Sequence, residues 1–420
     1  MSCSMRHSAI LLSLAAFFAA TAPLHAGDLE ANGHVKARGI LTTYPDDSLF
    51  RDIAGDETLD IQSDLRLNLK WRSGPWDVQA AGQLIVLYGE RIEFTRDLPA
   101  AIEALSPRLP DDRRRYFDLS TTLTDSGRTA TVARFDRLSV AWTGEKTVVR
   151  LGRQTLSWGN GLFYAPMDLV NPFDPATIDT EFKAGDDMLY VQHLFDNGSD
   201  VQGAVVGRRN PLNGERGSDQ STTALKYHGF MGEAEYDVLV ASHYSDPVIG
   251  LGGSKSVGGA IVRGDVVLTR TSDKTVANVV ANLNYSWIAF GKNMSGAVEY
   301  YYNGFGQTGN YDFTADPDLF LRLIRGDLFT LGRHYLAGSV TIEVSPLWTV
   351  TPVILANLQD PSGLLQVTTQ GSLGDNAVFI GTLGLPLGKS GSEFGGLDSG
   401  LPGRYLSTGP RIFAQLAWYF

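Results

Sequence analysis

The feature that most constrains the fold is a long alternation of apolar and polar residues in TLDIQSDLRLNLKWR, residues 58–72. One face is almost entirely apolar: Leu59, Ile61, Ser63, Leu65, Leu67, Leu69 and Trp71. The other face is polar and carries five charges: Asp60, Gln62, Asp64, Arg66, Asn68, Lys70 and Arg72. A period of two over fourteen residues predicts a β-strand, and the usual strand has only about five or six residues. The apolar face is long enough to cross a bilayer, which takes about nine to eleven tilted residues.

The same period of two recurs elsewhere, in segments 76–88, 276–287, 333–344 and 411–420. Some of the connections between such segments are tight turns, whereas others are long and polar, at 90–130, 158–182, 303–327 and 388–409. Short turns at one end and long loops at the other are typical of an outer-membrane barrel. A soluble sandwich would have shorter strands and more evenly spaced turns.

Tryptophan placement agrees with a membrane barrel. Six of the seven tryptophans lie beside the tight turns, where an aromatic girdle would meet the membrane interface: Trp71, Trp76, Trp142, Trp287, Trp348 and Trp418. We therefore predict an all-β fold, a single transmembrane antiparallel barrel of about 18 strands, an even number that returns both termini to one side. Segment 246–270 could hold one strand or two, and about 16 strands is the nearest alternative.

The start of the chain predicts export. Arg6 precedes an apolar run at 9–22 that is too short to span a bilayer as a helix, and a small residue, Ala26, follows it. We predict a cleaved signal peptide at 1–26 and a barrel at 27–420 in the cell outer membrane. The single cysteine, Cys3, lies in the removed segment, so no thiol chemistry is expected. The net charge of −11 argues against a nucleic-acid partner.

The last ten residues, RIFAQLAWYF, also alternate and end on Phe420. We expect this segment to pair with the first strand and close the barrel, which leaves no open edge in the membrane. A terminal Phe420 with Trp418 before it resembles the signal by which barrel-assembly machinery recognises its clients. Outer-membrane lipid would cover the apolar faces of the strands, and the sequence leaves open whether barrels associate into a homo-oligomer.

The polar faces of the strands would line a lumen. The side chains expected there are Asp60, Asp64, Arg66, Lys70, Arg72, Asn282, Glu299, Arg333, Glu343 and Arg411. Because their charges are mixed, they do not predict a preference for anions or cations. The five histidines beyond residue 26 lack metal-ligand spacing, so we expect no metal site and no cofactor.

The longest loop contains a basic run, PDDRRRYFD, at residues 110–118. If this loop folds into the lumen, Arg113, Arg114 and Arg115 would face acidic groups across a constriction, and crossed charges of this kind select permeants by charge. The simpler interpretation is a charge run exposed to solvent.

A second loop follows the strand that ends near Arg153. It is apolar between residues 162 and 170, so it should not extend into water. We expect it to fold into the mouth of the lumen, with Asp168, Asn171 and Asp174 held by Arg153 or by nearby basic groups. The alternative is a plug or latch that is needed for folding and binds nothing.

Two motifs carry a resemblance: LGRQTLSWGNGLFYAPMDLVNPFDP at 151–175 and EYYYNGFG at 299–306. With them, the sequence resembles a widespread and largely uncharacterised family of Gram-negative porin-like outer-membrane proteins, similar in build to alginate-export and substrate-specific porins. The arrangement of strands and loops expected over most of the chain is similar to that of the family, but only these two motifs are specific to it. It implies a monomeric or trimeric barrel that acts as a passive channel, and it assigns no substrate.

These observations favour an outer-membrane channel for the passive diffusion of small polar solutes, and not an enzyme. One alternative is an exporter or surface anchor for an acidic polysaccharide, which would need a continuous basic path through the lumen. The other is an outer-membrane hydrolase, for which His243 in ASHYSD is the only candidate worth testing.

Overall fold

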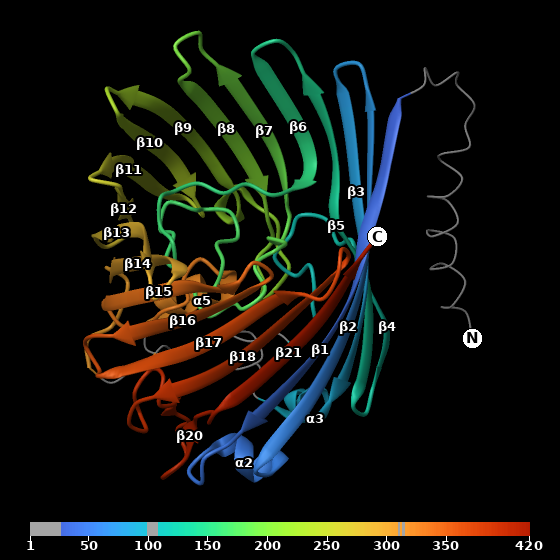
Figure 1. The fold of residues 1–420 in the computed structure, drawn as a ribbon, viewed down its shortest axis with the longest axis vertical. Helices are drawn as coiled ribbons and strands as arrows, with labels where there is room; N and C mark the ends of the chain where they lie inside the picture. Colours follow the sequence, from blue (N-terminus) through green and yellow to red (C-terminus); the bar gives the residue numbers. More distant parts are fainter. Residues whose placement is uncertain (1–26, 99–107, 310, 313–315) are drawn as a thin grey trace.

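The computed structural model describes residues 27–98, 108–309, 311–312 and 316–420. The predicted signal peptide, 1–26, lies outside the described residues. An antiparallel sheet of 18 strands closes on itself, because the last strand, β21, pairs with the first, β1 (Figure 1). The barrel strands are β1 (Asp28–Thr43), β2 (Glu57–Ser73), β3 (Trp76–Gly89), β5 (Thr129–Thr143), β6 (Thr147–Gln154), β7 (Asp186–Leu194), β8 (Asp200–Gly207), β9 (Thr222–Met231), β10 (Ala234–His243), β11 (Asp246–Val257), β12 (Ala260–Arg270), β13 (Thr275–Ala289), β14 (Lys292–Asn303), β15 (His334–Ser345), β16 (Trp348–Asn357), β17 (Ser362–Ser372), β18 (Ala377–Leu387) and β21 (Arg411–Tyr419).

The connections hold a few small elements. They are β4 (Ser120–Ser126), β19 (Leu397–Asp398), β20 (Tyr405–Leu406), the helices α2 (Leu49–Ala54), α3 (Glu90–Phe94) and α5 (Pro317–Arg325), and single 3-10 turns at Thr95–Asp97 and Ser218–Gln220. Strand β4, which the sequence did not predict, pairs with the first half of β5. Among the described residues, no helix is long and apolar enough to cross a membrane.

The predicted count of 18 strands is confirmed, and the alternative of 16 is wrong. Segment 246–270 holds two strands, because Val257 pairs with Ala260 and the chain reverses between them. Gly258 and Gly259, at φ 58° and 84°, form the turn. A two-residue type I′ hairpin requires positive φ at both central positions, which glycine adopts without strain.

The two ends of the barrel differ in their connections. At one end, which we call the short-turn end, neighbouring strands are joined by tight turns, as at residues 74–75 between β2 and β3. Asp28 lies at this end, paired with Arg72, and Phe420 exchanges backbone hydrogen bonds with Gly33. Both ends of the described chain therefore lie on the same side. The other end, which we call the long-loop end, carries the long connections.

The wall is inverted relative to a soluble protein, with apolar side chains outward and charged ones inward. On β2, Leu59 and Leu65 are 51% and 44% exposed, whereas Asp64 and Arg66 are only 6% and 1% exposed. The strict period of two sends alternate side chains to opposite faces, which explains this separation. The outer surface of the barrel is consequently an apolar band.

One long connection crosses the interior. Residues 155–185, which we call the mid-barrel belt, join β6 to β7 and lie inside the ring of strands (green coil in Figure 1). β6 and β7 have only 8 and 9 residues, against 16 and 17 in β1 and β2, so the belt leaves the wall part-way along the barrel. Its Trp158, Met167 and Val170 pack against wall residues in the largest buried apolar cluster. Trp158 is thus the one tryptophan away from the short-turn end.

Candidate functional site in the barrel lumen

A wall carboxylate holds the first part of the mid-barrel belt. Glu299 of β14 accepts hydrogen bonds from three successive backbone N–H groups, those of Leu162, Phe163 and Tyr164, at 2.5, 2.9 and 2.7 Å. Asn282 of β13 donates its side-chain amide to the same carboxylate at 3.1 Å. Successive backbone N–H groups that converge on one point form an anion-binding nest. Here the barrel itself supplies the anion, and Glu299 is completely buried.

The far part of the belt is held by the opposite wall. Lys36 of β1 forms ion pairs with Asp179 and Glu181 at 2.6 and 2.7 Å. Gln415 of β21 also donates to Asp179, at 3.0 Å. The ring of Phe182 covers the guanidinium of Arg66, whose central carbon lies 4.2 Å from the ring centroid. The belt therefore spans the lumen and is attached to walls on both sides.

Arg153 was expected to hold the aspartates of the belt, but it binds other partners. Its fully buried guanidinium pairs with Asp112 at 2.6 Å and with Asp187 of β7 at 2.9 Å. Burial alone would raise the pKa of Asp112, but the charges of Arg115 and Arg153 outweigh that effect and lower the pKa. Arg153 therefore ties the basic loop at 110–118 to the wall.

The polar residues of the belt find local partners instead. Asp168 pairs with Lys183 at 2.5 Å, and burial raises the pKa of Asp168 to about 6 despite that partner. Asn171 donates to the backbone carbonyl of Ala184 at 3.3 Å. Asp174 accepts from the backbone N–H of Ala176 at 2.8 Å, and its pKa is raised by burial. The nearby basic group that pairs with Asp168 is Lys183, which also belongs to the belt. The belt is therefore stabilised by contacts between its own residues.

The three arginines of the basic loop have different surroundings. Arg113 pairs with Asp111 of its own segment, and Arg115 pairs with Asp112 and donates to the carbonyl of Gly185. Both acids belong to the same loop, so these two ion pairs are local and do not cross the lumen. The guanidinium of Arg114 lies against Gly326, at the C-terminal end of α5, and burial lowers its pKa.

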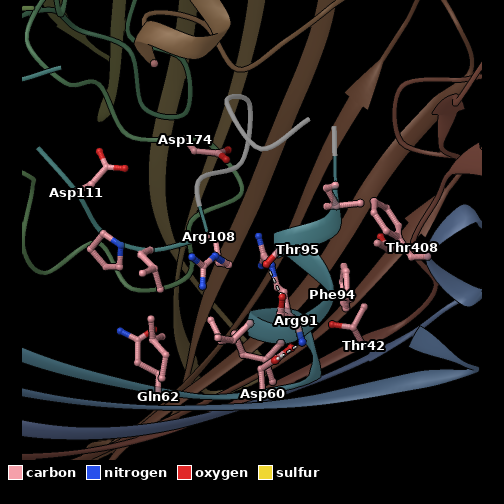
Figure 2. Close-up of a pocket in the computed structure, with 18 of the residues that line it drawn as sticks. Thr42, Asp60, Gln62, Arg91, Phe94, Thr95, Arg108, Asp111, Asp174 and Thr408 are labelled. Atoms are coloured by element: carbon pink, nitrogen blue, oxygen red, sulfur yellow. Dashed lines mark hydrogen bonds between the residues drawn. The ribbon is translucent and has the colours of Figure 1, made fainter. Parts of the chain in front are cut away.

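Above the belt, toward the long-loop end, lies a cavity of about 970 Å³. Seven arginines line it: Arg38, Arg91, Arg108, Arg113, Arg114, Arg134 and Arg411. Only three acidic residues do: Asp60, Asp111 and Asp174. Figure 2 shows Arg91 beside Asp60, whose carboxylate accepts the Arg91 backbone N–H at 3.1 Å. The lining therefore has an excess of positive charge.

Three of the seven arginines have no ion-pair or hydrogen-bond partner for their side chains among the described residues: Arg38, Arg114 and Arg411. The others are compensated, as Arg134 is by Asp136 at 2.8 Å. The positive charge that faces the cavity thus comes mainly from these three. The lining also includes apolar side chains from α3, α5 and the loops around them, such as Phe50, Phe94 and Phe329.

A second cavity, of about 590 Å³, shares the segment 108–113 with the first. Its lining is mostly polar and comes from β4, the basic loop and the connection after β8, as at Ser120 and Asn210. The segment 108–113 therefore lies between the two cavities near the long-loop end. Arg108 holds this partition through two contacts to Asp125 of β4, both 2.6 Å long.

A carboxylate on the opposite side of the lumen has no cationic partner among the described residues. Glu393, in the loop after β18, accepts hydrogen bonds from Tyr335 of β15 and Asn357 of β16 at 2.5 and 2.7 Å. It also accepts the backbone N–H of Leu331 at 2.8 Å. Burial raises the pKa of Glu393 to about 7.

The remaining sequence-predicted lumen residues lie at different levels of the barrel. Lys70 and Arg72 pair near the short-turn end with Asp77 and Glu30, and Glu343 accepts from Asn293 there. Arg333 precedes β15 and donates to the carbonyl of Gly306. Of the predicted set, only Asp60, Arg113, Arg114, Asp174 and Arg411 line the larger cavity.

Sequence reasoning missed two wall arginines of this cavity. Arg38 lies on the same face of β1 as the buried His34 and Lys36, so alternation within 28–43 could have found it. Arg134 lies before an irregularity in the pairing of β5 with β3, which breaks the alternation that would have identified its face.

His243 lies at the end of β10 and is almost completely buried. Its ring contacts the hydroxyl of Thr222 at 2.8 Å and faces Asp327 at 3.5 Å. Thr222 is 1% exposed and also accepts a hydrogen bond from Arg208. A substrate could not reach the buried hydroxyl of Thr222. The cluster of His243, Thr222 and Arg208 therefore holds neighbouring segments together rather than forming an accessible site.

No protein-family model matches the sequence, and no curated protein matches it. Solved structures match it in shape. A BenF-like porin from Pseudomonas fluorescens Pf-5 gives a TM-score of 0.51 at 9% identity, over 94% of this chain and 98% of the other. OccAB4 of Acinetobacter baumannii gives 0.52 at 9% identity, over 95% and 100%.

A third similar structure is Wzi of Escherichia coli, described as a carbohydrate-binding outer-membrane β-barrel involved in group 1 capsule assembly. It gives a TM-score of 0.52 at 10% identity, over 98% of this chain and 86% of the other. At such low identity the likeness concerns the fold. The chain is a closed, 18-stranded antiparallel barrel, and its fold is similar to that of the BenF-like porin and of Wzi.

Proposed function

We propose that the protein is an outer-membrane, porin-like channel through which small polar solutes diffuse passively, with a preference for anions. The fold likeness to porins supports the general role, and so does the apolar outer surface, since a barrel is one of the two structures that can span a bilayer. The signal peptide at 1–26 and the assembly signal at Trp418 and Phe420 remain predictions that agree with this location.

The observation that carries the anion preference is the set of three arginines in the larger cavity whose side chains have no ion-pair or hydrogen-bond partner among the described residues. Arg38, Arg114 and Arg411 line a partly open cavity inside the barrel, where the field of a charge is screened less than in open water. A passage lined by one sign of charge raises the local concentration of the opposite ion. The overall negative charge of the protein does not decide this question, because the lining determines the local potential.

An acidic polysaccharide would be attracted by the same arginines, and the likeness to Wzi keeps this alternative in view. The mid-barrel belt favours the smaller permeant. It is attached to both walls, and a polymer would need a continuous path past it.

The test is conductance in planar bilayers under a KCl gradient. The wild-type barrel should conduct, with a reversal potential that indicates chloride preference. Replacing both Arg38 and Arg411 by Gln should move the reversal potential toward potassium. The matched control is Arg270→Gln, because Arg270 alternates with the inward Thr269 and lies on the outer face of β12. A folded barrel without current would overturn the channel, and an unchanged reversal potential in the double variant would overturn the anion preference.

A further inference from the structure

Six hydroxyl side chains form a row across six adjacent strands, β13 to β18. Cross-strand pairing sets Ser286 opposite Ser295 and Ser295 opposite Thr341. A hydrogen bond of 3.1 Å joins Thr341 to Thr351, and pairing continues the row to Thr368 and Thr382. We call Ser286, Ser295, Thr341, Thr351, Thr368 and Thr382 the hydroxyl row.

All six members face the lumen, because each lies an even number of residues along its strand from a buried, inward-facing residue, as Ser286 does from Asn282 and Ser295 does from Glu299, or is itself buried, as Thr382 is. On β18, Thr382 is 4% exposed, whereas the next residue, Leu383, is 42% exposed on the outer face. On β17, Thr368 shares the inner face with Gln366, whose side chain donates to the carbonyl of Ala176 in the mid-barrel belt. Side chains two apart on a strand point the same way, so each hydroxyl projects inward.

The row lies on the short-turn side of the belt. Thr368 is two residues beyond the belt contact at Gln366, in the direction of the short-turn end. Ser295 and Glu299 lie on the same face of β14, with Ser295 nearer that end. Neighbouring strands are about 4.8 Å apart, so five steps cover about 24 Å. Because barrel strands are tilted, the row runs obliquely along the lumen and not around it in one plane.

The chemistry of the row differs from that of the arginine-lined cavity, because none of its members carries a charge. Thr341 and Thr351 are paired, and so are Thr368 and Thr382, at 2.9 Å. In each pair one hydroxyl donates to the other, which leaves one hydrogen and several lone pairs for a solute. Amide side chains flank the row. Gln370, for example, lies on the same face of β17 as Thr368, two residues nearer the short-turn end. Such a surface can donate and accept hydrogen bonds at many points.

We infer that the hydroxyl row binds the hydroxyl groups of polyhydroxylated permeants, so that the preferred solutes are small sugar acids. A polyol donates and accepts hydrogen bonds at closely spaced points, which matches a line of hydroxyls that do the same. The carboxylate of a sugar acid would be served by the arginines on the other side of the belt. The inference rests on the proposed channel for its anionic part, whereas its hydroxyl part stands on the row alone.

The test compares two probes with the same charge and ring size, D-glucuronate and cyclohexanecarboxylate, in the double variant Thr351→Val and Thr368→Val. Valine keeps the β-branched shape that strands favour and removes the hydroxyl. We expect the concentration of glucuronate that half-blocks the chloride current to rise by about three- to tenfold for each hydroxyl bond lost. Block by cyclohexanecarboxylate should not change. Thr369→Val is the control, since Thr369 is the neighbour of Thr368 on the outer face.

Equal block by the two probes in the wild-type barrel would overturn the inference, and so would a glucuronate block that the double variant leaves unchanged. Either result leaves the proposed channel intact, because the chloride current itself tests that proposal. If the barrel carries no current, equilibrium binding of radiolabelled glucuronate to the detergent-solubilised barrel decides the matter. Binding that the double variant weakens and the control does not would support the row, and the absence of binding would overturn it.

Discussion

Buried carboxylates on the two sides of the lumen have pKa values shifted in opposite directions. On the side of β5 to β8, Asp112 is enclosed by Arg115 and Arg153, and its pKa is lowered. On the side of β15 to β18, the donors that Glu393 receives from the described residues are all neutral, and burial raises the pKa of Glu393 to about 7. The difference shows that burial alone does not set the protonation of a carboxylate, because the partners supplied by neighbouring strands and loops determine which form is favoured.

The same contrast extends along the walls. The charged wall pairs Arg66 with Asp136 between its own strands, and the mid-barrel belt adds Asp179 as a partner of Lys36. The neutral wall carries the hydroxyl row, in which Thr341 is hydrogen-bonded to Thr351 and Thr368 to Thr382. The wall of buried charges therefore takes its partners both from neighbouring strands and from the segments inside the barrel, whereas the bonded hydroxyls of the row are partnered by neighbouring strands.

The largest effect is expected from Arg153→Leu, which leaves Asp112 and Asp187 as buried carboxylates without this partner. Breaking a buried ion pair from one side costs about 3–5 kcal/mol in the free energy of unfolding. Urea unfolding of the refolded barrel in detergent, followed by tryptophan fluorescence, measures it. Adding Asp112→Asn and Asp187→Asn should recover part of the loss. A triple variant as unstable as the single one would show that packing, and not charge, is responsible.

The next largest effect should come from Glu299→Ala, which removes the acceptor of three backbone N–H groups of the belt. Water can replace part of these bonds, so we expect a loss of about 2–3 kcal/mol in the free energy of unfolding. The belt should also loosen, which single-channel recordings would register as added current fluctuations. Glu343→Ala, at the short-turn end, is the control. Quiet recordings from a destabilised Glu299→Ala barrel would show that the belt keeps its position without this carboxylate.

On the neutral side, the comparison predicts a pH effect. The pKa of Glu393 rises from 4.5 to about 7 on folding, so the folded protein binds this proton more tightly than the unfolded chain does. Its contribution to stability is complete below pH 4.5 and is lost as the pH rises through 7. Between pH 5 and 8 the loss should be on the order of 2 kcal/mol.

Glu393→Gln should remove most of that pH dependence and make the barrel more stable than the wild type at pH 8. Urea midpoints at several pH values measure both. A variant with the pH profile of the wild type would assign the effect to another group.

The smallest effect on stability is expected from Arg114→Gln, because Arg114 forms no ion pair with a carboxylate of the described residues and interacts with Asp327 and Asp186 only through their charges. The change in unfolding free energy should stay below about 1 kcal/mol. The reversal potential, in contrast, should move toward potassium, since this arginine faces the larger cavity. Unfolding and bilayer measurements on the same preparation separate the two quantities. A large loss of stability with an unchanged reversal potential would make Arg114 a structural residue.

The sequence predicts the wall well and the interior poorly. Alternation as regular as that of Leu65 and Arg66 identifies both a strand and its two faces, and the predicted barrel of about 18 strands is confirmed, although segment 246–270 was left open between one strand and two. It does not reveal that Glu299 binds Leu162, because those residues are 137 positions apart and only the closed fold brings them together. For the same reason the partners of Arg153 could not be deduced, since charge alone does not distinguish Asp112 from Asp168.

The attachment of the mid-barrel belt to both walls also has a mechanical consequence. An empty ring of 18 strands can flatten under lateral pressure, because each strand is bonded only to its neighbours. Here Glu299 on one wall and Lys36 on the other are joined by a single stretch of chain, which acts as a cross-brace. Flattening the ring in that direction would have to compress or break those contacts. The belt thus helps to keep the cross-section round and the wall residues at a fixed separation.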